Sequence, residues 1–369
     1  MIKLRRVTSS QDYLPFIDGL RFYTLLSVVI IHFVDFYEEH TLAIRQNSLY
    51  QKLHLNEVFG FSDNSILVFF AISGFILGMP FAKSLLSKQP YPNLGDFYLR
   101  RITRLEPPYL VVLTSLFLLN VFVIHRDTLA NTAPHYFASF FYLHNIIYEY
   151  HPTLNFVFWT LEIEVQFYLL APLFAYVFKL DMLKRRVVLI GGMLLFGLMN
   201  YLYHPPFLSL YNYFHYFLAG FLALDLFLHN TFKKHYVFDI LCLVLAFLMY
   251  TGTFKYGLPI AFMITLLIYL SPLSILWEKI LTFQWITIIG GMCYTIYMLH
   301  QPLMAVFLNR FFGNGMIKNS LWTDFTIKLL LVLLLVLAAS TVFFILVERP
   351  CMKRGWYKKF IPARNKQPA

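Results

Sequence analysis

Long apolar runs, separated by short polar segments, extend through the whole chain. A membrane-spanning helix needs about 20 largely apolar residues, because lipid offers its backbone no hydrogen-bond partners. Ten segments meet or approach that length: 20–37, 62–82, 107–125, 155–178, 187–202, 212–228, 237–252, 258–276, 285–305 and 324–347. The sequence therefore predicts an all-α integral membrane protein with about ten transmembrane helices.

The composition supports a membrane setting. Only 13% of the 369 residues are charged and 59% are hydrophobic, whereas soluble domains carry about 25% charged residues. The first apolar run has Asp18 and Arg21 at its start, so we expect a retained span rather than a cleaved signal peptide. The segment 136–148 is too short and polar to cross and is predicted to lie at the membrane surface.

Lysines and arginines are concentrated on one side of the predicted spans. The segments 83–104 and 179–186 and the basic tail fall on the same side as the N-terminus, whereas the loops 38–61 and 126–154 on the other side carry few cations. By the positive-inside rule, both termini are predicted to be cytoplasmic. This distribution accounts for the net charge of +11 without a nucleic-acid partner.

No separate soluble domain is expected. We predict one membrane domain over residues 1–350 and a basic cytoplasmic tail over residues 351–369. The cysteines Cys242, Cys293 and Cys351 are scattered along the chain, so neither a metal site nor a disulfide framework is predicted.

Arg21 and His32 share one face of the first predicted span. Eleven residues separate them, and at about 100° per residue an α-helix brings the two side chains back to nearly the same direction. The rise of about 1.5 Å per residue sets them roughly 16 Å apart along the axis. Ionisable groups at such depth are costly, which indicates a functional site. A core histidine that is hydrogen-bonded to a neighbouring helix is the alternative for His32.

The predicted 155–178 helix carries Glu164 and Tyr168 on one stripe, since four residues make about one turn. Glu162 lies about 200° away from Glu164 around this helix, so the two carboxylates are not expected to form a pair. One of them is expected to face the protein interior and the other to have a different partner. Glu164 is a candidate for the chemistry or, alternatively, a structural counter-ion.

The predicted 285–305 span carries His300 in its outer third, with Tyr297 on the same face. His32, Glu164 and His300 are therefore expected to meet at one depth from three different spans. A hydroxyl acceptor needs a base that is active near neutral pH, and an unperturbed histidine pKa of about 6.5 suits that task.

Arg101 and Arg104 lie on the predicted cytoplasmic side, three residues apart. On a helix this spacing points both guanidinium groups one way, in a geometry suited to phosphate. Together with Arg21 they would form a cationic mouth. The neighbouring Arg100 is interpreted as a positive-inside anchor.

The stretch 69–78 contains Ser73 and a Gly74-x-x-x-Gly78 spacing. Small residues at this spacing let two helices approach closely, so a packing role is predicted. A catalytic role for Ser73 is not expected, because no basic partner is adjacent in sequence.

Taken together, these segments resemble the acyltransferase 3 family of membrane O-acyltransferases. The resemblance covers most of the chain, and its motifs occur in the family order. They are 17–21 with His32, 70–75, Arg101 with Arg104, 159–168, 294–302 and 348–350. The chain departs from the family pattern at Phe22, Val165 and Cys293, where a glycine, an acidic residue and a serine are usual.

The resemblance implies an enzyme of the cell (inner) membrane that moves an acyl group, commonly acetyl, from cytoplasmic acyl-CoA. The acceptor would be a hydroxyl of an extracytoplasmic glycan or another surface carbohydrate. In this interpretation Arg21, Arg101 and Arg104 hold the CoA phosphates, and no metal takes part.

For the acceptor side, our hypothesis is that His32 is the general base or, alternatively, carries the acyl group transiently. Glu164 would orient or charge-balance that imidazole. Tyr168 or His300 would position the acceptor or the oxyanion.

A secondary transporter with a His/Glu proton relay is the chief alternative, because transporters also place ionisable residues within their spans. Such a protein would not require the paired Arg101 and Arg104 beneath the stripe formed by Arg21 and His32.

Overall fold

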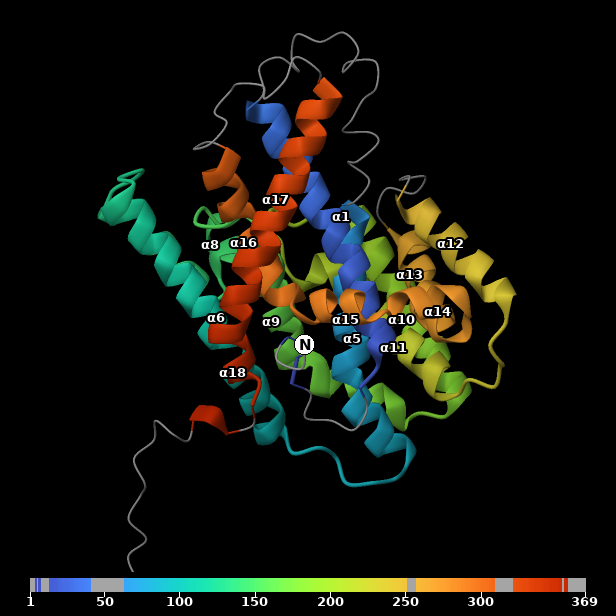
Figure 1. The fold of residues 1–369 in the computed structure, drawn as a ribbon. Coiled ribbons are helices and arrows are strands. Elements are labelled where there is room, and N and C mark those ends of the chain that lie inside the picture. Colours follow the sequence, from blue (N-terminus) through green and yellow to red (C-terminus); the bar gives the residue numbers. More distant parts are fainter. Residues whose placement is uncertain are drawn as a thin grey trace, which may run out of the picture.

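The protein forms a bundle of helices (Figure 1). The computed structural model describes residues 4, 6–7, 13–40, 63–250, 257–308, 321–353 and 355–357. Within these ranges all regular structure is helical, which confirms the predicted all-α class. Most of the tail predicted over 351–369 lies outside the described residues.

Three helices form the centre of the bundle: α1 (Pro15–His40), α5 (Asp63–Leu86) and α11 (Leu210–Leu228). Helices α5 and α11 approach so closely that their glycines contact the opposite backbone. A Cβ atom on Gly220 of α11 would lie 2.0 Å from the carbonyl oxygen of Ala71, and one on Gly74 would lie 2.3 Å from that of Phe217. The packing role predicted for Gly74 is thus confirmed.

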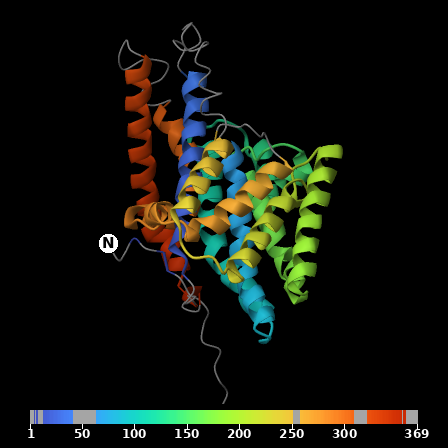
Figure 2. The same ribbon diagram turned by 90° about the vertical axis from the view of Figure 1, so that its right-hand side faces the viewer.

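The remaining long helices surround this centre. They are α6 (Leu94–Leu118), α9 (Phe158–Phe174), α10 (Met182–Leu202), α12 (Tyr236–Tyr250), α13 (Leu258–Leu270) and α17 (Leu321–Phe343). In Figures 1 and 2, α1 and α17 stand side by side and project beyond the other helices at one end. Tyr37 of α1 donates a hydrogen bond of 2.7 Å to Asp324 of α17, and Lys328 pairs with the same carboxylate at 3.0 Å.

Five described helices are long and apolar enough to cross a membrane: Pro15–Glu38, Asn64–Leu86, Leu94–Val123, Phe158–Lys179 and Trp322–Cys351. Two shorter apolar helices, Tyr236–Met249 and Leu258–Leu273, accompany them. The chain is therefore an integral membrane protein. The count of ten spans and the cytoplasmic position of both termini stay predictions.

The predicted 285–305 span is wrong as a single helix. The structure divides it at Met292 into α15 (Gln284–Gly291) and α16 (Cys293–Phe307). Helix α15 and the preceding α14 (Leu276–Leu281) run across the long axis of α1 (Figure 1). A Cβ atom on Gly290 would lie 1.8 Å from the carbonyl oxygen of Asp18. The glycine therefore permits a crossing that forces the chain to break before α16.

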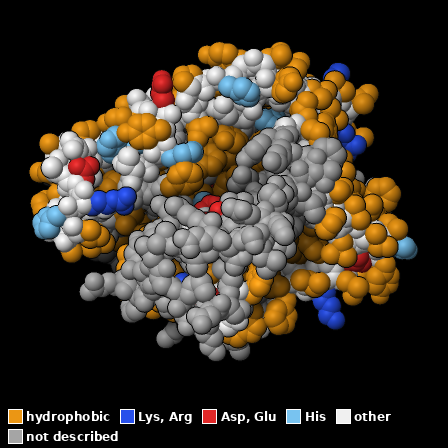
Figure 3. Space-filling view, turned by 90° about the horizontal axis from the view of Figure 1, so that it is seen from above, with side chains coloured by type: hydrophobic (Ala, Val, Ile, Leu, Met, Phe, Trp, Pro, Cys, Tyr) orange, Lys and Arg blue, Asp and Glu red, His pale blue; other side chains and the backbone are white. Residues whose placement is uncertain are grey.

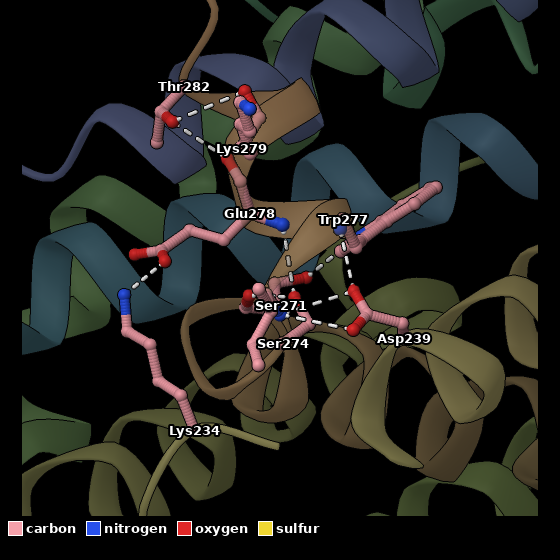
Figure 4. A network of polar contacts seen from close by, with 9 residues as sticks. Lys234, Asp239, Ser271, Ser274, Trp277, Glu278, Lys279 and Thr282 are labelled. Carbon is pink, nitrogen blue, oxygen red and sulfur yellow. Dashed lines mark hydrogen bonds and ion pairs between the residues drawn. The ribbon is translucent and has the colours of Figure 1, made fainter. Parts of the chain in front are cut away.

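A polar network fixes α14 against its neighbours (Figure 4). Asp239 of α12 accepts hydrogen bonds from the backbone N–H groups of Ile275 at 3.2 Å and Trp277 at 2.7 Å. The carboxylate thereby satisfies donors that the start of a helix leaves unpaired. The Trp277 indole donates to Ser271 at 3.1 Å, and its ring packs edge-on against Tyr23 of α1 with 6.1 Å between centroids.

The segment predicted to lie at the membrane surface forms two short helices, α7 (Leu129–Phe140) and α8 (His144–Tyr148). Tyr142 between them adopts a left-handed backbone conformation with φ of 58°, which ends α7. Both helices are shorter than a membrane span requires.

Replacing Gly220 with alanine is expected to destabilise the protein by about 1–3 kcal/mol, because the new methyl group would force α5 and α11 apart. Thermal unfolding in detergent measures this loss. Gly191→Ala on α10 is the matched control, since no atom lies within 4 Å of a Cβ atom there. Equal unfolding midpoints for the two variants would contradict the close-packing argument.

Candidate active site

A cavity of about 130 Å³ lies between α1, α5, α6, α9 and α16. Apolar side chains of α5, including Phe69 and Phe70, form much of one wall. Six charged residues line it: Arg6, Arg21, Arg101, Arg104, Glu164 and Glu348. We call this space the arginine cavity.

Asp18 fixes two of these arginines. It is fully buried, and its two oxygens accept from Arg21 Nη1 at 3.1 Å and pair with Arg6 Nε at 3.0 Å. Burial and the neighbouring Arg21 lower the pKa of Arg6 to about 10, so Arg6 remains charged near pH 7. The sequence offered no signal for the position of Arg6 in the cavity beyond its charge.

Helix α6 supplies the other two arginines. Arg101 and Arg104 both line the cavity, so the structure brings them together with Arg21 as the spacing predicted. The Nε atoms of Arg101 and Arg104 are buried and have no hydrogen-bond partner among the residues that the structure describes. Buried donors without partners are costly, and an anionic ligand in the cavity would satisfy them.

The stripe on α9 faces this cavity. Thr160, Glu164 and Tyr168, each four residues apart, all line it. Glu164 accepts hydrogen bonds from the hydroxyls of Ser73 and Tyr168. Ser73 thus has an acidic partner from another helix in addition to its place in the helix packing, a contact that neighbouring sequence could not reveal.

Glu162 has a different partner, as expected from its angle around the helix. Its carboxylate accepts from the backbone N–H of Asn145 at 2.8 Å and so caps α8. Glu162 is fully buried and does not line the arginine cavity.

Glu348 is a further cavity residue. It closes the π-helical turn η7 (Phe344–Glu348) that follows α17, and it accepts a hydrogen bond from Thr295 of α16. Its carboxylate interacts electrostatically with Arg104 and Arg21. Glu348 belongs to the motif at 348–350, but the sequence alone did not indicate that it lies in the site.

His32 and His300 form a second group, which we call the histidine pair. Their ring centroids lie 5.3 Å apart, and neither ring lines the arginine cavity. The His32 side chain is 18% exposed, whereas His300 is fully buried. Access to the pair from outside the protein is therefore through His32.

Hydrogen bonds assign the protons of the histidine pair. His300 Nδ1 lies 3.1 Å from the carbonyl oxygen of Ile296, which only accepts, so Nδ1 carries the proton. The lone pair of the neutral ring is then on Nε2, which is buried without a partner in the described part of the chain. His32 Nδ1 lies 3.3 Å from the Gln301 side-chain nitrogen, which donates to it.

The expected meeting of all three groups at one depth is only partly observed. The structure brings His32 and His300 together but places Glu164 among the arginines, with Ser73 and Tyr168 as its partners. Helical spacing gave the correct face of α9, whereas the depth of each residue depends on how far the helices slide past one another.

No group of three or more histidine, cysteine, aspartate or glutamate side chains suited to a metal ion occurs in the parts of the chain that the structure describes. The three cysteines are free thiols, two of them buried. The polar groups of the site are thus guanidinium, carboxylate, hydroxyl and imidazole groups.

These features define an integral membrane protein with a buried, charged cavity between its helices. A family model described as an acyltransferase domain matches residues 14–347, and the chain belongs to this acyltransferase 3 family. Membership of this family favours acyl transfer over the alternative of a secondary transporter.

Two curated relatives are similar to parts of the chain. Peptidoglycan O-acetyltransferase OatA of Listeria monocytogenes is 29% identical over 225 residues, which cover 55% of this chain and 31% of that protein. The candidate acetyltransferase ORF330 of Acidianus two-tailed virus is 26% identical over 222 residues, covering 59% of this chain and 57% of that protein. No solved structure gives a significant match.

A cluster of histidine and tyrosine rings lies on α7 and α8, outside the spans. His135 Nδ1 and His144 Nε2 are 3.0 Å apart, and Tyr148 packs against both rings. Burial and the neighbouring His135 lower the pKa of His144 to about 4. Figure 3 shows several histidines among hydrophobic side chains on the face seen from above.

The thermal stability of the protein is expected to fall as the pH drops from about 6.5 toward 4. Between these values the unfolded chain binds a proton at His144 and the folded protein does not, so stability is fully present only above the unfolded pKa. Unfolding midpoints measured across this range should vary less in His144→Gln. His204→Gln, at an exposed site, is the control, and an identical pH profile in both variants would sink the prediction.

Proposed function

We propose that the protein transfers an acyl group from cytoplasmic acyl-CoA to a hydroxyl of an extracytoplasmic surface carbohydrate. Both relatives are named acetyltransferases, so acetyl is the acyl group that we propose. Peptidoglycan, the acceptor named for the Listeria relative, sets the class of acceptor as a cell-envelope glycan. The site of action is then the cell (inner) membrane, with lipid around the apolar helices.

The convergence of four arginines on one cavity carries this proposal. They come from the segment before α1, from α1 and from α6, and they outnumber the two carboxylates that line the same space. Guanidinium groups bind phosphate through paired N–H donors, and CoA carries several phosphates. The positive-inside rule predicts a cytoplasmic position for Arg101 and Arg104, the side on which we propose that acyl-CoA binds.

The histidine pair supports acceptor activation. In the proposed reaction an imidazole takes the proton of the carbohydrate hydroxyl, and the hydroxyl oxygen attacks the thioester carbonyl. The C–S bond then breaks, and CoA leaves as the thiol. His32 is the base because it is the exposed member, and its Nδ1 lone pair exchanges the Gln301 amide for the acceptor hydroxyl before the proton moves. Transient acylation of His32 is the alternative route.

The remaining site residues support the arginine cavity and the histidine pair. His300 holds the ring of His32 from the buried side and helps to position the acceptor or the oxyanion. Glu164 and Tyr168 line the same cavity as the arginines, so in our proposal they orient the acyl-CoA donor. Glu164 also balances part of the cationic charge when the cavity holds no phosphate.

His32→Ala is expected to abolish acyl transfer while the protein still inserts into the membrane, because the variant removes the accessible base. The measurement is acyl-CoA-dependent labelling of cell-surface glycan in cells that carry each variant. His204→Ala, at an exposed position, should label like the parent protein. Full labelling in the His32 variant would remove this mechanism.

Arg101→Ala is expected to raise the KM for acyl-CoA by about ten- to a hundredfold with a smaller effect on kcat, the range that follows from losing a hydrogen bond to a charged group. Arg126→Ala provides an arginine control in an exposed loop. An unchanged KM in the Arg101 variant would contradict donor binding in the arginine cavity.

A further inference from the structure

Tyr297 and Thr160 line the arginine cavity on the side of the histidine pair. The Tyr297 hydroxyl and the Thr160 hydroxyl lie 2.8 Å apart and join α16 to α9. Both residues line the cavity, and the Tyr297 ring also packs edge-on against Phe69 of α5 at 6.2 Å. We call Tyr297 and Thr160 the gate pair.

The His300 ring lies next to the Tyr297 ring and outside the cavity lining. Its ring centroid is 5.7 Å from that of Tyr297 and 5.3 Å from that of His32. Three rings therefore follow one another in space: Tyr297 in the cavity wall, then His300, then the partly exposed His32. Since neither histidine lines the cavity, the Tyr297 ring is the partition between the donor and the histidine pair.

His300 Nε2 points to a change at this partition. The atom is fully buried, carries the lone pair of the neutral ring and has no hydrogen-bond partner among the described residues. A buried polar atom without a partner is costly, and native structures retain such atoms mainly where a group is to be bound or moved. An N–H or O–H group that entered past Tyr297 would donate the missing hydrogen bond.

We propose that Tyr297, held by Thr160, is a gate between the arginine cavity and the histidine pair. In the closed position described here, the partition separates the thioester from the histidines. When donor and acceptor are both in place, the Tyr297 ring turns away from Thr160 and the acyl group reaches His300 and His32. This inference rests on the proposed acyl transfer.

The gate pair is suited to this role because its closure is specific but weak. A single hydrogen bond between two neutral hydroxyls contributes little net free energy, so the ring turns without breaking the helix packing. While it is closed, the ring keeps water on the histidine side away from the thioester. Water that reached it would attack the carbonyl carbon and break the C–S bond, releasing the free acid and CoA thiol.

The test compares two substitutions that open the gate in different ways. Tyr297→Phe keeps the ring and loses its hydroxyl, whereas Thr160→Val keeps the tyrosine and loses its partner. Both should raise acyl-CoA hydrolysis in the absence of acceptor by about fivefold, the shift expected from losing one neutral hydrogen bond. Thr265→Val is the matched control, because that buried hydroxyl bonds to Ala261 at 2.9 Å outside the cavity lining.

A second readout does not depend on acyl transfer. Cys293 lines the arginine cavity, and replacing Cys242 and Cys351 with serine leaves it as the one thiol of the chain. A small charged thiol reagent added on the side of His32 should modify Cys293 faster in the Tyr297→Phe and Thr160→Val backgrounds than in the parent. The Thr265→Val background should react like the parent.

The outcomes separate the gate from the proposed function. Faster hydrolysis and faster Cys293 modification in both gate variants support the gate, and no change in either measurement overturns it. Loss of all turnover in Tyr297→Phe with normal behaviour of Thr160→Val also overturns it, because the tyrosine hydroxyl would then act in the chemistry. If the parent protein turns over no acyl-CoA, the proposed function fails, and Cys293 modification alone decides on the gate.

Discussion

The buried carboxylate of Asp18 is the contact on which the site depends. It pairs with Arg21 on its own helix and with Arg6 from the segment before it, and its backbone oxygen faces Gly290 of α15. A carboxylate without exposed surface is stable only with such partners, since the low dielectric makes an unpaired charge costly. One residue thereby holds two guanidinium groups at the cavity and the crossing helix against α1.

The arrangement separates two kinds of chemistry within one bundle. Cations and carboxylates line the arginine cavity, and the cations are in excess. An anionic acyl donor would neutralise that excess positive charge. The histidine pair lies apart from it, and of its two rings only that of His32 has exposed surface. For the proposed transfer across the membrane, this separation leaves water from one side no direct path to the other.

Close backbone packing makes the separation possible. Gly220 lets α11 approach α5, and Gly290 lets α15 cross α1. The crossing ends at Met292, so α16 begins within the protein and carries Tyr297 and His300 along the site. Glycines have this effect because they remove the Cβ atom that would otherwise hold two helices apart.

The sequence alone determined the membrane setting, the helical class and the faces of single helices. Apolar length predicts a helix without regard to its neighbours, and helical periodicity placed Glu164 with Tyr168. The tertiary structure decided what depends on the relative positions of helices. It added Arg6 to the cavity, paired Glu164 with Ser73 and broke the span at Met292. Periodicity fixes directions around an axis, whereas contacts between segments distant in sequence depend on packing, because only packing sets how helices slide and cross.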